Sequence, residues 1–375
     1  MTRAVSGAGL DAVVVGAGPA GLATSRELQR RGVRHVVLER GEAAGQSWAD
    51  YYESLTLHTG RHLSALPGLP LPRGVPLFPP RGEFAAYLRD YAARFALPVR
   101  PRSPATAVRR EHGHWHVETP AGTLVARALV VATGIAANPR RPTLPGEASF
   151  GGDVRHSVAY RRPDAYVGRR VLVVGVGNSG GEIAAELAAA GAAVTIAVRS
   201  GAHVVPRTLF GLPVQYWSVL LQPLPRRARD AVAAAVGRVG ELRRGPSPLP
   251  RPAYGPLDAI PLIGFHLVDA IRAGRVALAG AVTALVPGGA RFADGDERPF
   301  DAVILATGFA AALQPLGGLV TTDARGFARR TDRVTSADQP ALWFVGHRYD
   351  ASGALFNIGR DAPQAAAGVA ATIGR

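Results

Sequence analysis

The chain has 375 residues, 47% of them hydrophobic, and a formal net charge of +15. At about 150 residues per domain, this length predicts two or three domains with substantial cores. The sequence contains no cysteine, which excludes disulfides, thiolate metal sites, iron–sulfur clusters and the dithiol relay of the flavin-disulfide reductases.

The positive charge is carried by arginine, because the sequence contains no lysine. The arginines are scattered and accompany no nucleic-acid-binding motif, so we expect no nucleic acid partner. No apolar run is long enough to span a bilayer, and the first residues lack the basic and apolar regions of a signal peptide. The expectation is a cytoplasmic protein without integral membrane association, and no metal site is predicted.

The first predicted elements are a strand at residues 11–15, a glycine-rich turn and a helix ending at Gly32. In such a turn the first glycine allows a sharp bend, the second lets a pyrophosphate approach the main chain, and the third lets the helix pack on the strand. The helix amino end offers free N–H groups to phosphate. This dinucleotide site is expected to use Gly16, Gly18, Pro19, Ala20 and Gly21.

A second strand at residues 36–38 is closed by Glu39, which stands 18 residues after Gly21. At this interval an acidic residue accepts hydrogen bonds from a ribose diol. A carboxylate there repels a 2′-phosphate, so the first site favours FAD or NAD.

The middle of the chain predicts irregular structure at residues 60–82 and a helix at 84–95. Candidate strands follow at 115–118 and 124–125. A buried strand at 128–134 then ends in an Ala-Thr-Gly turn.

A second strand, glycine turn and helix begin near Arg170. The expected nucleotide contacts in this turn are Gly175, Gly177, Asn178, Ser179 and Gly180. Asn178 and Ser179 open the helix, where they can bond to pyrophosphate or cap the helix.

The next strand, at residues 196–198, is followed by Arg199 and Ser200. A guanidinium and a hydroxyl can hold a 2′-phosphate, so this end of the second unit favours NADP. An ordinary surface charge at Arg199 is the open alternative.

The Ala-Thr-Gly element recurs at residues 306–308, after another buried strand. The two elements predict where the chain passes between nucleotide domains. The expected fold class is α/β, with two Rossmann-type dinucleotide-binding domains and the NADP domain inserted in a discontinuous FAD domain. The predicted boundaries are 1–164 and 281–375 for the FAD domain and 165–280 for the NADP domain.

Residues 209–262 combine an apolar stretch at 216–221 with arginines and many prolines. A helix at 227–242 carries valines on one side, which is typical of a helix packed on its own core. A lid, a membrane-surface contact and a dimer face all stay open for this segment.

Residues 150–160 have the form F-x-G-x-x-x-H-x-x-x-Y, directly ahead of the second glycine unit. With this motif the chain resembles the flavin-containing monooxygenase family, the class B flavoprotein monooxygenases, and in particular its bacterial members and the plant indole-pyruvate monooxygenases. Tyr160 argues against the related Baeyer–Villiger enzymes, which usually have tryptophan at this position. Further family features occur in order at residues 46–48, 55–59, 177–180, 198–200, 205–207, 305–309 and 358–361.

The resemblance implies FAD and NADPH as cofactors, and O2 and a small organic molecule as substrates. In the family NADPH reduces FAD, O2 forms a C4a-hydroperoxyflavin, and one oxygen atom enters the substrate at nitrogen, sulfur or a carbonyl such as that of a 2-oxo acid. An NADPH-dependent flavin reductase or oxidase, a Baeyer–Villiger monooxygenase and a non-enzymatic redox-sensing nucleotide-binding protein stay open. A homodimer is one of the assemblies left open.

The resemblance also implies roles outside the glycine turns. His58, where many members have asparagine, is expected beside the flavin and nicotinamide as a catalytic or cofactor-contacting residue, with a core histidine as the alternative. His156 is expected to couple the domain linker to the nucleotides, and Gly359 to open the final helix, whose amino end would stabilise reduced flavin. For Trp48, packing on the flavin and filling the core both stay open. The other expected cofactor contacts are Arg40, Gln46, Ser47, Trp48, Thr59, Val108, Ala132, Thr133, Gly134, Arg207, Ala306, Thr307, Gly308 and Gly346.

Overall fold

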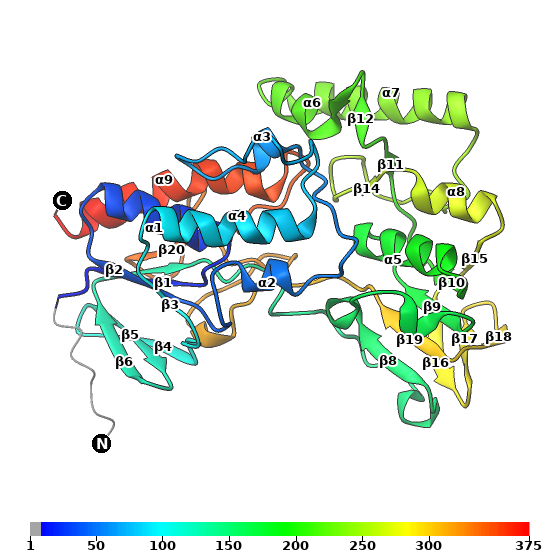
Figure 1. Cartoon of the computed structure of the whole chain (residues 1–375), viewed down its shortest axis with the longest axis horizontal. Coiled ribbons are helices and arrows are strands. Elements are labelled where there is room, and N and C mark those ends of the chain that lie inside the picture. The colour runs from blue at the N-terminus through cyan, green and yellow to red at the C-terminus, as the bar shows by residue number, and fades with distance from the viewer. Residues whose placement is uncertain (1–8, 375) are drawn as a thin grey trace. The chain divides into compact units, whose positions relative to one another are not determined.

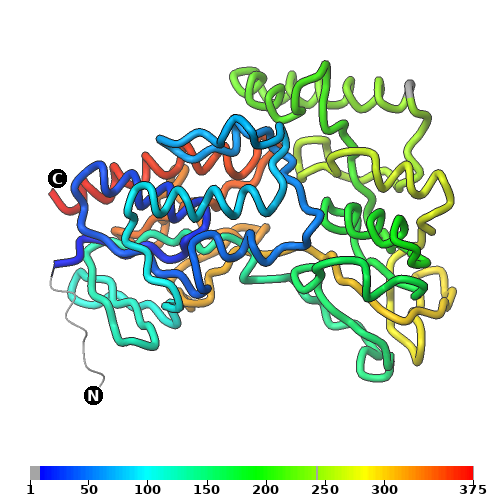
Figure 2. Tube along the Cα trace, in the orientation of Figure 1, coloured from blue at the N-terminus to red at the C-terminus, as the bar shows by residue number. Residues whose placement is uncertain are grey.

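The computed structural model describes residues 9–374, with all side chains except those of residues 242 and 243 (Figure 1). The described chain forms two compact units. The first runs to Asp50 and continues through Leu55–Asn138 and the chain from Phe309, whereas the second combines Tyr51–Ser54 with Pro139–Gly308. In Figure 2 the red C-terminal segment lies beside the blue N-terminal segment within the first unit.

The first unit is built on a parallel sheet with the strand order β20-β7-β1-β2-β3. Its strands are β1 (Ala12–Val15), β2 (His35–Leu38), β3 (Val99–Arg100), β7 (Ala128–Val131) and β20 (Leu342–Phe344). The helices of this unit are α1 (Pro19–Arg30), α2 (Gln46–Ala49), α3 (Arg61–Ser64), α4 (Arg81–Arg94) and α9 (Ala354–Thr372). A small antiparallel sheet consists of β4 (Ala107–Glu111), β5 (His114–Thr119) and β6 (Gly122–Ala126).

The alternation of side chains along β1 explains the layers of this unit. Ala12 and Val14 lie in one hydrophobic core with residues of α1, α4 and α9. Val13 and Val15 lie in another core with residues of the antiparallel sheet. Because successive side chains of a strand point to opposite faces, a strand buried on both faces has apolar residues at every position.

The second unit repeats this plan with the parallel strand order β15-β10-β9-β19-β8. Its central strands are β8 (Asp153–His156), β9 (Arg170–Val174), β10 (Ala193–Ala197), β15 (Val276–Ala279) and β19 (Ala302–Leu305). Helices α5 (Asn178–Ala189) and α8 (His266–Arg272) pack together. The strands β16 (Val282–Val286), β17 (Gly289–Phe292) and β18 (Glu297–Pro299) form an antiparallel sheet, and β16 and β17 share a core with β9, β10 and β19.

The two parallel sheets with their helices confirm the α/β fold class, but the compact units differ from the predicted domain boundaries. Residues 281–308 and the motif at 150–160 lie in the second unit, outside the predicted 165–280. The physical reason is strand pairing: β19 lies between β9 and β8, so the terminal strand and the motif strand complete the sheet of the second unit.

Within 209–262 the structure has one long helix and several short elements. These are β12 (Thr208–Leu209), β13 (Leu212–Pro213), α6 (Val214–Leu220) and α7 (Arg226–Arg244), and the strands β11 (Val204–Val205) and β14 (Leu262–Ile263) flank them. On α7, Val232 and Val239 are exposed, so the predicted packing of the valine side into a core is wrong for these two residues. None of the helices in the described part of the chain is long and apolar enough to cross a membrane.

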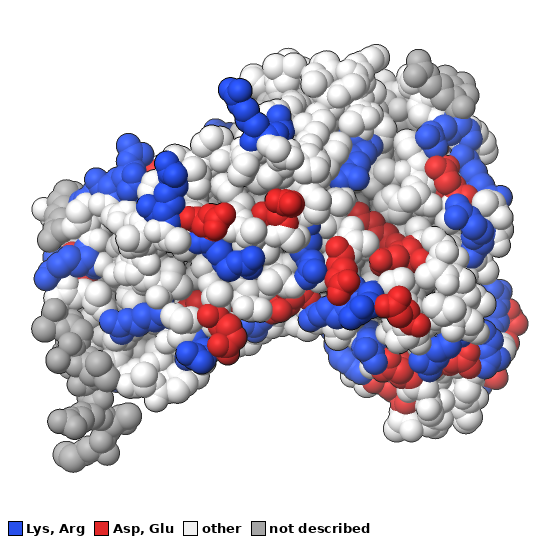
Figure 3. Space-filling view, viewed as in Figure 1, with Lys and Arg blue, Asp and Glu red and all other residues white. Residues whose placement is uncertain are grey.

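Charged side chains of both signs are interspersed on the face drawn in Figure 3. The described residues form exposed ion pairs, such as Arg109 with Glu111 and Arg291 with Glu297. Exposed pairs of this kind contribute at most about 1 kcal/mol each.

A buried histidine follows β20. The His347 ring is 2% exposed and lies against Phe327 and Phe344. Neither ring nitrogen has a hydrogen-bond partner among the described residues. Burial, and to a smaller degree Arg330, lowers the pKa of His347 to about 3, so the ring is neutral in the folded chain.

This histidine is expected to make the protein acid-sensitive. Its folded-state pKa lies below the ordinary value of 6.5, so its contribution to stability is present above pH 6.5 and is lost as the pH falls toward 3, by about 1.4 kcal/mol per pH unit. We expect His347→Phe to remove this pH-dependent contribution to the free energy of unfolding. Phe keeps the packing, and no hydrogen bond is lost. Urea unfolding at pH 7.5 and pH 5 measures it, with the exposed His114→Ala as control, and an unchanged pH dependence in His347→Phe would contradict it.

Candidate functional site

The first glycine turn joins β1 to α1 in the first unit. Gly16 has a φ of +102°, and a Cβ atom there would lie 2.6 Å from the Ala132 carbonyl oxygen. A Cβ at Gly21 would overlap the Gly16 carbonyl, whereas one at Gly18 would meet nothing within 4 Å. The outer glycines are therefore required for packing, and the middle glycine borders open space at the helix N-cap.

Glu39 holds this turn from the end of β2. Its carboxylate is buried and accepts hydrogen bonds from the backbone N–H groups of Ala17 at 2.9 Å and Gly41 at 2.8 Å. Each carboxylate oxygen has more than one acceptor site, so capacity for a further donor remains. Arg40, the next residue, is exposed.

The second glycine turn, between β9 and α5, has the same geometry in the second unit. Gly175 has a φ of +110°, and a Cβ there would lie 2.6 Å from the Ala306 carbonyl oxygen. A Cβ at Gly180 would overlap the Gly175 carbonyl, and one at Gly177 would meet nothing within 4 Å. The likeness extends to Ala306, which plays the part that Ala132 plays in the first turn.

The repeated Ala-Thr-Gly elements lie where the chain passes between the units, as predicted. The Thr133 hydroxyl donates to the Ala312 carbonyl at 2.6 Å, and the Thr307 hydroxyl donates to the Arg140 carbonyl. Each threonine thus binds the other crossing segment within its own unit. Gly134 and Gly308 both have positive φ angles, which end the strands in turns.

The side chain of Asn178 does not cap α5. Its Nδ2 donates to the Pro261 carbonyl at 3.0 Å, and its Oδ1 accepts from the Ile263 N–H at 2.8 Å. The helix N-cap is Gly177. The predicted capping role is therefore wrong, because Asn178 instead binds the segment around β14 to the start of α5.

The signature motif ties the second unit together. His156 Nδ1 accepts from the Val158 N–H at 3.1 Å, and Nε2 donates to the Gly308 carbonyl at 3.0 Å. Burial lowers the pKa of His156, and its two ring nitrogens act as one acceptor and one donor, as in a neutral ring. The Tyr160 hydroxyl donates to Glu186 Oε2 of α5 at 2.8 Å.

Arg199 and Ser200 come after β10, separated from it by Val198, and both are exposed. Arg207 is half-buried, and burial lowers its pKa, opposed by the nearby Glu182 carboxylate. The side chains at the end of the second strand therefore remain open to a ligand.

The loop with His58 lies at the amino end of α9. The Leu57 N–H donates to the Pro79 carbonyl at 2.8 Å, and Thr59 Oγ1 accepts from the Ser64 hydroxyl at 2.9 Å. A Cβ on Gly353, the N-cap of α9, would lie 2.6 Å from Thr59 Cγ2. His58 is half-buried in this loop.

The final helix begins five residues earlier than predicted. Since α9 starts at Ala354, Gly359 lies in its second turn and does not open it. The free N–H groups of the helix therefore lie beside Thr59 rather than at Gly359. Gly346 lies nearby, because a Cβ there would be 3.0 Å from Ala20 Cβ in α1 and 3.7 Å from Ile358 in α9.

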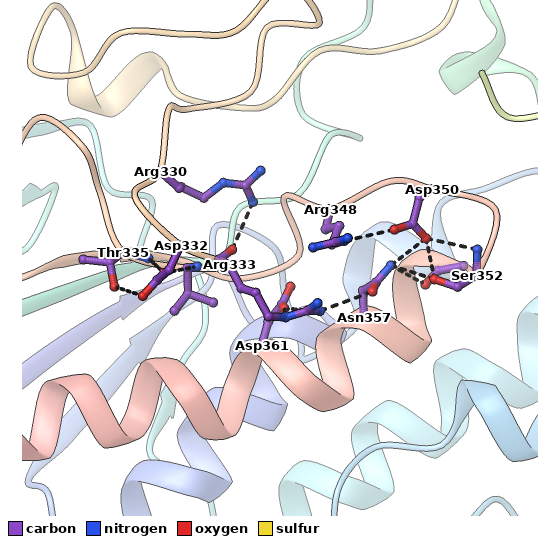
Figure 4. A network of polar contacts seen from close by, with 11 residues as sticks. Arg330, Asp332, Arg333, Thr335, Arg348, Asp350, Ser352, Asn357 and Asp361 are labelled. Atoms are coloured by element: carbon purple, nitrogen blue, oxygen red, sulfur yellow. Dashed lines mark hydrogen bonds and ion pairs between the residues drawn. The ribbon is translucent and has the colours of Figure 1, made fainter. Parts of the chain in front are cut away.

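A polar network that the sequence analysis missed surrounds the start of α9 (Figure 4). Asn357 Nδ2 donates to Asp350 Oδ1 at 3.0 Å and to the Gly353 carbonyl at 3.2 Å. Arg333 donates to the fully buried Asp361 with Nε at 2.8 Å and Nη2 at 2.7 Å. Only the motif at 358–361 pointed to this region, and its spacing carries no signal for Arg333.

The remaining predicted contacts lie in the first unit, some packed in its core and others hydrogen-bonded near α2. Trp48 packs edge-on against Phe84 of α4, with ring centroids 4.7 Å apart, which supports the core alternative. Gln46 Nε2 donates to Asp50 at 2.9 Å, and Ser47 lies between these residues on α2. The Val108 side chain is buried in the core, so only its main chain remains for a cofactor contact.

Comparisons with known proteins agree with this architecture. Residues 13–208 match the family model described as pyridine nucleotide-disulphide oxidoreductase. The rice (Oryza sativa subsp. japonica) indole-3-pyruvate monooxygenase YUCCA1 is 39% identical over 80% of this chain and 76% of its own length. The probable indole-3-pyruvate monooxygenase YUCCA4 of Arabidopsis thaliana is 36% identical over 79% of this chain and 75% of its own length. The chain belongs to the flavin-containing monooxygenase family.

A solved structure supports the same assignment. The flavin-containing monooxygenase from Stenotrophomonas maltophilia superposes with a TM-score of 0.76 at 28% identity, covering 96% of this chain and 98% of that one. The protein is thus an enzyme, a flavin monooxygenase that oxygenates a small substrate. The disulphide chemistry in the family model's description does not apply, because this flavin monooxygenase has no cysteine.

Proposed function

We propose that the protein is an FAD- and NADPH-dependent monooxygenase with two Rossmann-type nucleotide domains. FAD binds at the turn before α1 and NADPH at the turn before α5. The observation that carries this proposal is a contrast between two units whose glycine turns have the same geometry. The second strand of the first unit is followed by Glu39, and that of the second unit is followed, after Val198, by Arg199. The carboxylate selects a ribose diol, and the guanidinium selects a 2′-phosphate.

The open space beside Gly18 and Gly177 supports a pyrophosphate at each turn, where the first N–H groups of α1 and α5 donate to it. At the start of α9, the free N–H groups stabilise negative charge on the flavin. Bound FAD supplies hydride acceptance from NADPH and the activation of O2. His58 is the proposed catalytic residue, because it is half-buried in the loop that contacts the N-cap of α9.

For the substrate we propose a 2-oxo acid of the kind that the relatives' names give, with indole-3-pyruvate as the first compound to assay. The test measures NADPH consumption, hydrogen peroxide release and incorporation of ¹⁸O from ¹⁸O2 into product in the same reaction. Substrate-dependent incorporation of one labelled atom per NADPH supports the proposal. Full conversion of NADPH to peroxide with every 2-oxo acid, amine, sulfide and ketone tried would replace it by an NADPH oxidase.

Arg199→Ala is expected to raise KM for NADPH by about tenfold or more while changing KM for NADH little, because only NADPH carries the 2′-phosphate that the guanidinium would bind. Steady-state kinetics with both nucleotides measures this. The exposed Arg227→Ala on α7 is the control for general loss of positive charge. Equal changes for both nucleotides would remove Arg199 from the 2′-phosphate site.

A further inference from the structure

A segment of four residues leaves the first unit and returns to it. The segment Tyr51–Ser54 belongs to the second unit, although the residues on both sides of it belong to the first. Both ends of the segment are fixed in the first unit by one residue at the start of α4. The Arg81 N–H donates to the Leu55 carbonyl at 2.8 Å, and the Arg81 guanidinium donates to the Ala49 carbonyl.

Tyr52 anchors the segment in the second unit. It is 3% exposed, and its hydroxyl donates to Glu182 Oε2 and hydrogen-bonds to Ser179. Burial and the Glu182 carboxylate raise the pKa of Tyr52, so the hydroxyl keeps its proton. Its ring lies in a row with Tyr160 and Tyr166, with centroids 6.1 Å and 6.0 Å apart.

The partners of Tyr52 lie at the proposed NADPH site. Ser179 and Glu182 belong to the first turns of α5, which begins directly after the second glycine turn. A phosphate bound to the N–H groups of this turn restrains the residues that hold the Tyr52 hydroxyl.

The chain from Tyr52 to Leu55 is anchored by hydrogen bonds at almost every residue. The Glu53 N–H donates to the Arg161 carbonyl at 2.9 Å in the second unit, and Leu55 is already bonded to Arg81 in the first. Only Ser54 stands between these two anchored residues. His58 follows three residues after Leu55, in the loop that contacts the N-cap of α9.

We propose that Tyr52 is a positioning residue that transmits nucleotide occupancy at the start of α5 to the loop carrying His58. The inference rests on the proposed binding of NADPH at that turn. It makes the Tyr52 hydroxyl unnecessary for nucleotide affinity but necessary for the response of residues 55–59.

Hydrogen–deuterium exchange of the flavin-loaded enzyme, with and without NADP⁺, tests this. The expected result for the natural protein is that NADP⁺ slows exchange in residues 175–182 and in residues 55–59. In Tyr52→Phe we expect NADP⁺ still to slow exchange in residues 175–182 but no longer in residues 55–59. The variant should also release more peroxide per NADPH, with KM for NADPH unchanged. Tyr166→Phe is the matched control, because it removes a hydroxyl from the same row of tyrosines that has no hydrogen-bond partner among the described residues; it keeps both responses.

A second variant inserts two glycines after Ser54. The insertion leaves the Tyr52 contacts in place but lengthens the connection to Leu55, so NADP⁺ should no longer slow exchange in residues 55–59. This variant keeps the test valid if Tyr52→Phe fails to fold. A retained 55–59 response in either folded variant overturns the positioning role alone. Absence of NADP⁺ protection at 175–182 in the natural protein overturns the proposed nucleotide site and the positioning role with it.

Discussion

Gly21→Ala and Gly180→Ala are expected to destabilise the protein by about 3 kcal/mol or more, because overpacking against a fixed backbone leaves no room for relaxation. In each case the new Cβ would overlap the carbonyl of the first glycine in the same turn. That carbonyl belongs to the backbone, so the clash can be relieved only by moving the helix from the strand. Urea unfolding followed by circular dichroism measures the loss.

The middle glycines provide the matched controls. Gly18 and Gly177 have φ angles of −77° and −72°, which alanine adopts without strain, and their Cβ atoms would meet nothing within 4 Å. We expect Gly18→Ala and Gly177→Ala to fold with stability within about 1 kcal/mol of the natural protein.

The same two variants are expected to lose ligand binding at separate sites. Gly18→Ala should be purified with a reduced flavin-to-protein ratio, and Gly177→Ala should retain flavin but raise KM for NADPH by about tenfold or more. If both variants keep normal flavin content and normal KM, the open space beside the middle glycines is not where the pyrophosphates bind. If Gly21→Ala and Gly180→Ala fold normally, the packing role of the outer glycines is wrong.

Arg333→Met is expected to cost about 3–5 kcal/mol at pH 8, because removing one partner of a buried ion pair leaves a charge without compensation. Asp361 is fully buried, and its Oδ2 has no hydrogen-bond partner in the described part of the chain. Burial raises the pKa of Asp361, and Arg333 opposes that shift most strongly, with smaller effects from Arg330 and Arg348. Without the guanidinium the folded-state pKa rises further.

The cost of Arg333→Met should depend on pH in a defined direction. A carboxyl whose folded-state pKa lies above its unfolded value contributes stability at low pH and loses it as the pH rises through the folded-state pKa. The difference between the natural protein and Arg333→Met is therefore largest at pH 8 and becomes smaller as the pH falls and Asp361 takes up a proton.

Arg348→Met is the control in the same network (Figure 4), because Arg348 pairs with Asp350 where both side chains are more than a third exposed. Its loss is expected to cost at most about 1 kcal/mol. Urea unfolding of the three proteins at pH 5 and pH 8 checks both expectations. A loss for Arg333→Met no larger than that for Arg348→Met would show that Asp361 does not depend on the guanidinium.

The sequence predicted the glycine turns correctly because their determinants are local. A strand, three glycines and a helix follow one another within about 30 residues. The first glycine of each turn has a positive φ, and a Cβ on the last would clash with the carbonyl of the first. The contrast between Glu39 and Arg199 was visible for the same reason, since Glu39 directly follows β2 and Arg199 lies two residues after the end of β10.

The start of α9 was placed wrongly because the resemblance put the helix start at Gly359, whereas the helix begins at Ala354. Glycine inside a helix costs only about 1 kcal/mol relative to alanine, and the packing of α9 along α1 outweighs this cost. The helix therefore runs through Gly359 and even through Pro363.

The sequence by itself determined the two β-α-β units, their glycine-rich turns and the opposite charges that follow the second strand of each unit, because these depend on neighbouring residues and a fixed periodicity. Only the tertiary structure decided the contacts that join distant residues: Asn178 with Ile263, Arg333 with Asp361, and Tyr52 with Glu182. Such pairs are set by which strands and helices become neighbours when the sheets form. No spacing along the chain encodes that, so these side chains acquire their roles only in the folded units.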